Sequence, residues 1–169
     1  GEGTNSAEFS ADFTYFINKF SNNTTPDQFT LHKTKSGIKL KEILDNKELS
    51  NKLSGYEISP KEFSTIAING NELNMWMVKP KDFDPSKKYP LILFIYGEPA
   101  NSTVQDNWAR RGMWHQYMAQ QGYIIMSVDN RGTDVPRGRA WRKSIYRQVG
   151  ILAAHDQAKA AREIFERFH

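Results

Sequence analysis

The chain has 169 residues, which suffice for one ordinary domain or for parts of two. Its 38% of hydrophobic and 25% of charged residues are typical of a globular protein rather than a disordered one. The formal net charge is +4 and most basic residues are scattered along the chain, which argues against a nucleic acid as partner. Cysteine is absent, so the composition excludes disulfides, thiol nucleophiles and thiolate metal sites.

Neither a metal, nor a cofactor, nor a membrane span is expected. The four histidines, His32, His115, His155 and His169, are too dispersed for a local metal motif. No apolar run reaches the ~18 residues that a membrane-spanning helix needs, and the first residues lack the character of a signal peptide. The sequence does not begin with methionine, which suggests a piece excised from a longer protein.

Short β elements are predicted for the first part of the chain. Residues 13–20 are rich in β-forming side chains, residues 28–33 alternate polar and apolar side chains, and residues 38–44 follow a Ser-Gly turn. This spacing predicts an antiparallel meander of three strands, as in a sandwich or a propeller blade. Two interpretations stay open: a small β cap, or the last blade of a propeller. A short helix is expected over residues 46–54, and a domain boundary near residues 50–60.

A β-hairpin is predicted beyond that boundary. Residues 62–68 and 72–78 are β-rich runs separated by Asn69, Gly70 and Asn71. Asn-Gly between two such runs is a strong signal for a type I′ turn, because both central residues of that turn need a positive φ.

Two apolar runs then predict a strand, helix, strand unit. Residues 91–96 and 123–128 are nearly continuous apolar runs of the kind found in strands buried on both faces. Residues 107–121 can form a helix that ends at Gly122. The two strands should therefore be parallel, with residues 96–99 and 129–132 at their carboxyl ends, where such sheets carry their chemistry.

Two more helices are expected towards the end of the chain. One covers roughly residues 138–146, and the other runs from residue 150 onward. The second has an apolar stripe that should face the core, made of Ala153, Ala154, Ala158, Ala161, Ile164, Phe165 and Phe168. The polar side chains, Gln157 among them, are assigned to the remaining faces.

Five segments resemble, in order and spacing, the dipeptidyl peptidase IV branch of the prolyl oligopeptidase family: residues 84–90 (DPSKKYP), 96–99 (YGEP), 128–133 (VDNRGT), 137–139 (RGR) and 155–157 (HDQ). Residues 5–10 (NSAEFS) and 43–46 (ILDN) look like the last propeller blade and its exit. The resemblance implies an α/β fold: part of an α/β-hydrolase sheet, a hairpin plus parallel strands with helices, preceded by antiparallel strands of a propeller blade. It implies two domains, residues 1–54 from the propeller with its exit helix and residues 55–169 from the N-terminal half of the hydrolase domain.

The same resemblance implies a serine exopeptidase that releases Xaa-Pro or Xaa-Ala dipeptides from peptide N-termini. No Gly-x-Ser-x-Gly elbow occurs in the chain, and His155 and Asp156 are adjacent on a helix, so they cannot pair as members of a triad. The nucleophile and triad would therefore lie outside the chain, which alone should be inactive. The implied partners are peptide substrates in the intact parent and the remainder of the enzyme. The unpaired strand edge predicts a homo-oligomer. A periplasmic or cell-surface location is suggested by the resemblance only.

One functional residue carries over from the resemblance, which implies that Tyr96 donates its hydroxyl to the oxyanion. The alternative is that Tyr96 only caps a buried strand. Glu98 and Ala100 depart from the family's usual Gly-Gly-Pro loop, and this favours a second interpretation, a non-catalytic homologue that serves as a scaffold or interaction module. For the other candidates a structural role is expected: Asp129 and Arg131 should brace loops, and Trp114 and Tyr117 should pack in the core.

Overall fold

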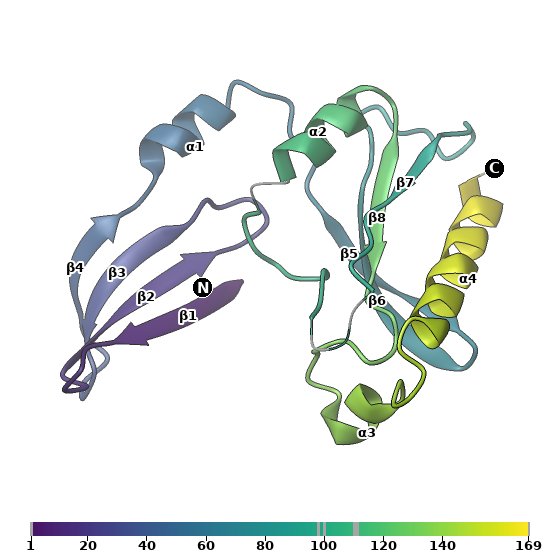
Figure 1. Ribbon diagram of the computed structural model, residues 1–169. Helices are drawn as coiled ribbons and strands as arrows, with labels where there is room; N and C mark the ends of the chain where they lie inside the picture. Colours follow the sequence, from purple (N-terminus) through teal and green to yellow (C-terminus); the bar gives the residue numbers. More distant parts are fainter. Residues whose placement is uncertain (1, 98, 100, 110–111, 169) are drawn as a thin grey trace. The chain divides into compact units, whose positions relative to one another are not determined.

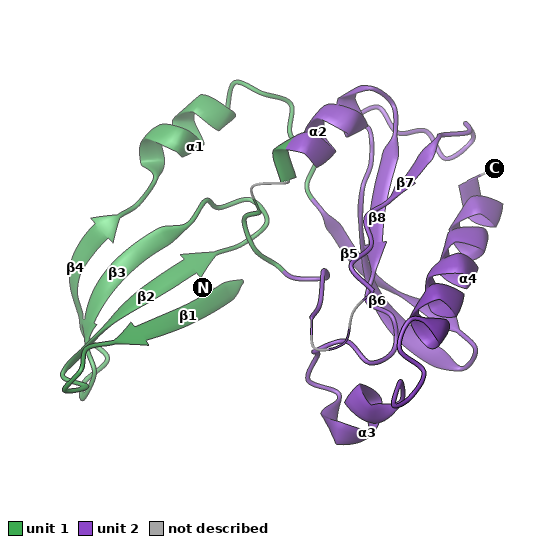
Figure 2. Cartoon of the chain, in the orientation of Figure 1, with its two compact units in different colours: residues 1–60, 106–113 green, residues 61–105, 114–169 purple. Residues whose placement is uncertain are grey.

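The computed structural model describes residues 2–97, 99, 101–109 and 112–168. The chain forms two compact units (Figure 2). Unit 1 consists of residues 1–60 and 106–113, and unit 2 of residues 61–105 and 114–169. The chain therefore leaves unit 2 after residue 105 and returns to it at residue 114.

Unit 1 is built on a four-stranded antiparallel sheet in the order β1-β2-β3-β4 (Figure 1). The strands are β1 (Thr4–Phe9), β2 (Tyr15–Ser21), β3 (Gln28–Lys33) and β4 (Lys39–Leu44), and the helix α1 (Lys47–Leu53) follows. The sequence predicted the last three strands and the helix but not β1. The polar segment of β1 has little β propensity of its own, and it becomes a strand because it pairs with β2 from Thr4 opposite Ser21 to Phe9 opposite Phe16.

The segment that returns to unit 1 is held there by hydrogen bonds to the sheet. The Asp106 carboxylate accepts a bond of 2.7 Å from the backbone N–H of Asn23, and the Asp106 carbonyl accepts one of 2.7 Å from Thr4 Oγ1. The backbone N–H of Trp108 donates to Ser21 Oγ at 3.3 Å. These contacts explain why the helix predicted over residues 107–121 begins only at Gly112, where α2 (Gly112–Gln120) starts.

Unit 2 contains a second four-stranded sheet, in the order β5-β6-β8-β7. Its strands are β5 (Glu62–Ile68), β6 (Asn71–Val78), β7 (Leu91–Leu93) and β8 (Ile124–Val128). The prediction of a type I′ hairpin is confirmed, since Asn69 and Gly70 have φ values of 51° and 74° between β5 and β6. The predicted parallel pair is also confirmed, because Leu91 pairs with Ile124 and Leu93 with Met126.

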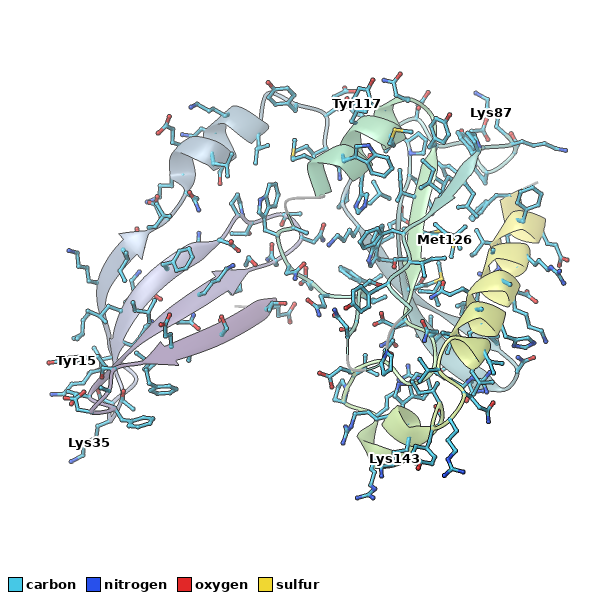
Figure 3. The ribbon with its side chains drawn as sticks, in the orientation of Figure 1. Tyr15, Lys35, Lys87, Tyr117, Met126 and Lys143 are labelled. Carbon is cyan, nitrogen blue, oxygen red and sulfur yellow. The ribbon has the colours of Figure 1, made fainter. Side chains whose placement is uncertain are left out.

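Helices pack on both faces of this sheet, α2 on one and α4 (Ile151–Phe168) on the other (Figure 1). Successive side chains of a strand point to opposite faces, so β6 and β8 contribute to two apolar cores. The core under α4 holds Met75, Met77, Ile124, Met126, Ala160 and Ile164, and the core under α2 holds Trp76, Val78, Ile125 and Ala119. Met126 can be seen between β8 and α4 in Figure 3. The short helix α3 (Gly138–Lys143) agrees with the helix predicted there but ends earlier.

Two predictions about burial were wrong. The first parallel strand was expected to span residues 91–96 and to be buried on both faces, but β7 ends at Leu93 and is only half-buried. It pairs with β8 alone among the described residues, so its other edge lacks a neighbour. Trp114 and Tyr117 were expected in the core but are 51% and 58% exposed, because α2 buries His115 and Ala119 instead. Tyr117 is labelled on α2 in Figure 3.

Candidate functional site

Tyr96 lies three residues beyond the end of β7, at the carboxyl edge of the sheet of unit 2. Its side chain is 52% exposed and lines a hollow of about 590 Å³ between the end of β7 and α4. Gly97 follows with a φ of 77°, a backbone conformation that favours glycine. The two departures from the family loop, Glu98 and Ala100, lie outside the described residues. The half-exposed Tyr96 therefore lies at the edge of the sheet where α/β folds commonly bind ligands.

The hollow is mainly apolar and continues along β7. On the helix side it is lined by Gly150, Ala153, Ala154, Gln157, Ala158 and Ala161. A second hollow of about 370 Å³ shares Leu93 and Ala161 with the first and extends to Pro90 and Phe165. The predicted apolar stripe of α4 is therefore divided: Ile164 is buried in the core against the sheet, whereas Ala154, Ala158 and Phe165 are exposed and border this groove.

Asp129, at the carboxyl end of β8, braces a neighbouring loop. Its side chain is almost completely buried, and Oδ1 accepts hydrogen bonds from the backbone N–H groups of Thr103 (2.7 Å) and Val104 (3.3 Å). Burial raises the pKa of the Asp129 carboxyl, and these N–H groups oppose that rise. The contacts are of the kind predicted for Asp129, an acceptor of backbone N–H groups that holds a loop.

The hydroxyl groups of Ser127 and Thr103 connect the loop that Asp129 holds to the backbone of Phe94, two residues before Tyr96. Ser127 Oγ, on β8, donates to the Phe94 carbonyl at 2.5 Å, and Thr103 Oγ1 lies 2.6 Å from Ser127 Oγ. Trp76 Nε1 donates to the Thr103 carbonyl at 2.9 Å. The sequence predicted a bracing role for neither Ser127 nor Thr103. The signal that could have revealed the role of Ser127 is that it is a serine inside an otherwise apolar strand.

Arg131 is held by Asp156, a residue of α4 that is completely buried. The backbone N–H of Arg131 donates to Asp156 Oδ2 at 3.0 Å, Nε donates to the same oxygen at 2.9 Å, and Nη2 donates to Oδ1 at 2.7 Å. These hydrogen bonds raise the pKa of Arg131. The predicted bracing of Arg131 by a carboxylate is confirmed by these contacts, which tie the loop after β8 to α4.

The assignment of Gln157 to a polar face of the last helix was wrong. Gln157 is buried, and its Nε2 donates to the Val128 carbonyl at 2.7 Å and to Asn130 Oδ1 at 3.2 Å. The helix turns this amide and Asp156 towards the loop after β8 because that loop carries backbone groups that need partners. The signal that could have revealed the burial of Asp156 and Gln157 was their place in the HDQ segment, residues 155–157, which resembles the family.

The structure brings no triad together from the histidine and aspartate of α4. His155 is half exposed, and its Nδ1 lies 4.0 Å from Asp156 Oδ1, which is engaged by Arg131. Within the described ranges, no group of three His, Cys, Asp or Glu side chains is placed to hold a metal ion. In the same part of the chain, no helix combines the length and the apolar character needed to cross a membrane.

Comparisons with known proteins identify the family. Residues 110–169 match the prolyl oligopeptidase family of peptidases. The chain is 34% identical over 140 residues to prolyl endopeptidase FAP of Homo sapiens, covering 81% of the chain and 18% of the relative. It is 34% identical over 165 residues to dipeptidyl peptidase 4 of Trichophyton rubrum, covering 95% of the chain and 21% of the relative. The crystal structure of Porphyromonas gingivalis dipeptidyl peptidase 4 superposes with a TM-score of 0.89 at 40% identity, covering 96% of the chain and 23% of that structure.

The chain belongs to the prolyl oligopeptidase family. Within the family, the relatives it matches place it in the dipeptidyl peptidase IV branch, as the sequence motifs indicated. The predicted fold class is confirmed with it: unit 2 carries part of an α/β-hydrolase sheet, and the antiparallel strands of a propeller blade precede it. The chain spans about a fifth of the length of the relatives it matches.

Proposed function

We propose that the chain is part of a serine exopeptidase that releases Xaa-Pro or Xaa-Ala dipeptides from the N-termini of peptides, with Tyr96 as a donor to the oxyanion. The support is the match of nearly the whole chain to dipeptidyl peptidases, together with the exposed phenol at the carboxyl edge of the sheet. The observation that carries the proposal is the position of Tyr96 just beyond β7, on a hollow that a substrate can enter.

The chemistry assigned to Tyr96 is the stabilisation of charge in the transition state. When a serine attacks a peptide carbonyl, negative charge develops on the carbonyl oxygen, and a fixed phenol O–H can donate a hydrogen bond to it. One such donor lowers the barrier by about 2.7–4 kcal/mol, provided it is held in place before the reaction. The position of Tyr96 shortly after the end of β7 is proposed to hold its phenol in place in this way.

The chain by itself is proposed to be inactive, because the nucleophile elbow and the triad are assigned to other segments of the parent enzyme. Residues 1–54 are assigned to the last propeller strands and the exit helix, and residues 55–169 to the N-terminal half of the hydrolase domain. The partners proposed are peptide substrates, in the intact parent, and the remainder of the enzyme.

The alternative is a non-catalytic homologue in which this region serves as a scaffold or interaction module. The observation that favours it is the Tyr-Gly-Glu-Pro-Ala sequence at residues 96–100, which replaces a permissive glycine of the family loop by Glu98. The two functions are distinguished by whether the full-length protein turns over a dipeptide substrate.

The test is the release of a chromophore from a Gly-Pro conjugate by the full-length protein that contains this chain. Tyr96→Phe removes only the hydroxyl and should lower kcat by about 10²–10³-fold with little change in KM. Tyr146→Phe is the matched control, since Tyr146 is 69% exposed in the same unit and its loss of a hydroxyl should leave kcat unchanged. Absence of turnover would support the scaffold, and turnover that Tyr96→Phe does not change would refute the role of Tyr96.

Association is the second part of the proposal. The free edge of β7 and the apolar groove beside it expose Ile95, Tyr96 and Phe165 by about half of their surfaces. Open strand edges with apolar side chains recruit further chains. The isolated chain should therefore form homo-oligomers or bind the remainder of the enzyme, and light scattering coupled to size exclusion that shows a monodisperse, cooperatively melting monomer would contradict this.

A further inference from the structure

We infer that Thr103, Ser127 and Asp129 are positioning residues that anchor the backbone on both sides of Tyr96. The inference rests on the proposed function for its catalytic consequence, because Tyr96 matters to the reaction only as an oxyanion donor. The anchoring itself rests on the hydrogen bonds that join the end of β8, the end of β7 and the loop at residues 103–104.

The first anchor is the backbone of Phe94, through its N–H and its carbonyl. Its N–H donates to the Met126 carbonyl at 2.8 Å, and its carbonyl accepts the hydroxyl hydrogen of Ser127 at 2.5 Å. The side chain of Ser127 is buried, whereas Tyr96, two residues after Phe94, is half exposed. Phe94 is thus the last residue before Tyr96 for which the structure shows both backbone polar groups bonded to β8.

The second anchor is Thr103, seven residues after Tyr96. Its N–H donates to Asp129 Oδ1 at 2.7 Å, and its carbonyl accepts Trp76 Nε1 at 2.9 Å. Its hydroxyl lies 2.6 Å from Ser127 Oγ. Because Trp76 and Asp129 are both buried, Thr103 is held against rigid neighbours from β6 and β8.

A count of hydrogens fixes the direction of the chain of hydroxyls. Ser127 has one hydroxyl hydrogen, and it is donated to the Phe94 carbonyl. The 2.6 Å contact between Thr103 and Ser127 must therefore use the hydrogen of Thr103. Thr103 Oγ1 also donates to Asp129 Oδ1 at 3.2 Å, so its one hydrogen is shared between Ser127 Oγ and the Asp129 carboxylate. The order is Thr103 to Ser127 to Phe94, so the loss of either hydroxyl removes one of the hydrogen bonds that hold the segment carrying Tyr96.

The experiment compares Thr103→Val, Ser127→Ala and the conservative Thr103→Ser in the full-length protein, each alone and combined with Tyr96→Phe. Thr133→Val is the control, because Thr133 is buried like Ser127 and its hydroxyl donates to a carbonyl of its own loop, that of Asn130, at 2.9 Å. Two readouts are used: kcat and KM for a Gly-Pro chromophore substrate, and hydrogen exchange of the backbone at residues 94–97.

Loss of one hydroxyl is expected to lower kcat by about tenfold with less than about a twofold change in KM, and Thr103→Ser should restore it. In the Tyr96→Phe background the same substitutions should change kcat by less than about twofold, since residues that act through one group are not additive. Exchange at residues 94–97 should become faster in Thr103→Val and Ser127→Ala but not in Thr133→Val.

The outcomes separate the two proposals. Suppose that Tyr96→Phe lowers kcat, and that adding Thr103→Val to this variant lowers kcat by the same factor as Thr103→Val does in the wild type. The positioning role is then refuted and the proposed function stands. If Tyr96→Phe leaves kcat unchanged, the role of Tyr96 as oxyanion donor is refuted, and faster exchange in Thr103→Val still supports the anchoring. Unchanged exchange in both Thr103→Val and Ser127→Ala overturns the anchoring whatever the kinetics show.

Discussion

The substitution Asp156→Ala should be strongly destabilising, because Asp156 joins α4 to the loop after β8. The carboxylate is completely buried and accepts the backbone N–H, Nε–H and Nη2–H of Arg131 at 2.7 to 3.0 Å. Removing one member of a buried ion pair typically costs about 3–5 kcal/mol, since the other member keeps its desolvation penalty.

The size of the effect depends on which member is removed. The Arg131 side chain keeps 18% of its surface exposed, so after Asp156→Ala its guanidinium can recruit water, and the expected loss is about 2–4 kcal/mol. After Arg131→Ala the carboxylate has no exposed surface and retains only the backbone N–H, so the expected loss lies near the upper end, about 4–5 kcal/mol. The double variant Arg131→Ala, Asp156→Ala should lose less than the sum of the two single variants.

The assay is urea unfolding followed by tryptophan fluorescence, with midpoints and slopes compared between variants. Glu48→Ala is the control, because Glu48 and Lys52 form an ion pair of similar length, 2.8 Å, on the exposed surface of α1. Its unfolding should stay within experimental error of the wild type. Losses below about 1 kcal/mol for both single variants, or strict additivity in the double variant, would refute the reasoning that burial makes the pair important.

Three further predictions concern backbone conformation and pH. Gly132→Ala should lower Tm far more than Gly150→Ala, because both glycines have a positive φ but a Cβ at Gly132 would meet the Ile145 side chain at 2.5 Å, and equal shifts would contradict this. Burial raises the pKa of Asp129 above 3.8, so the Tm advantage of the wild type over Asp129→Asn should shrink as pH rises above that value. Hydrogen bonds from Thr14 and Ser10 lower the pKa of Asp12 from 3.8 to about 2, so the advantage over Asp12→Asn should instead shrink as pH falls through that interval, and parallel pH profiles for the two variants would contradict both assignments.

Much of the site could be predicted from the sequence because strand ends can be located by local pattern. The two apolar runs predicted a parallel pair and directed attention to its carboxyl ends, residues 96–99 and 129–132, where Asp129 and Arg131 were expected to brace loops. The role of Tyr96 came from the family resemblance. The bonding partners of these residues were not predicted. Thr103 and Ser127 lie 24 residues apart and meet only once β8 is in place, and the pairing of Arg131 with Asp156 depends on how α4 lies over the sheet.

The sequence by itself determined the local elements: the Asn-Gly hairpin, the parallel strands, the helices and the motifs of the family. These depend on turn chemistry and on hydrophobic period, which are properties of neighbouring residues. Only the tertiary structure decided which face of each element is buried. From helical spacing alone, Trp114 and Tyr117 were predicted to lie in the core and Gln157 on the surface. The packing of α2 and α4 reversed all three predictions. The physical reason is that burial depends on which neighbours cover a face, and polar groups such as Gln157 are buried where a loop offers backbone partners to them.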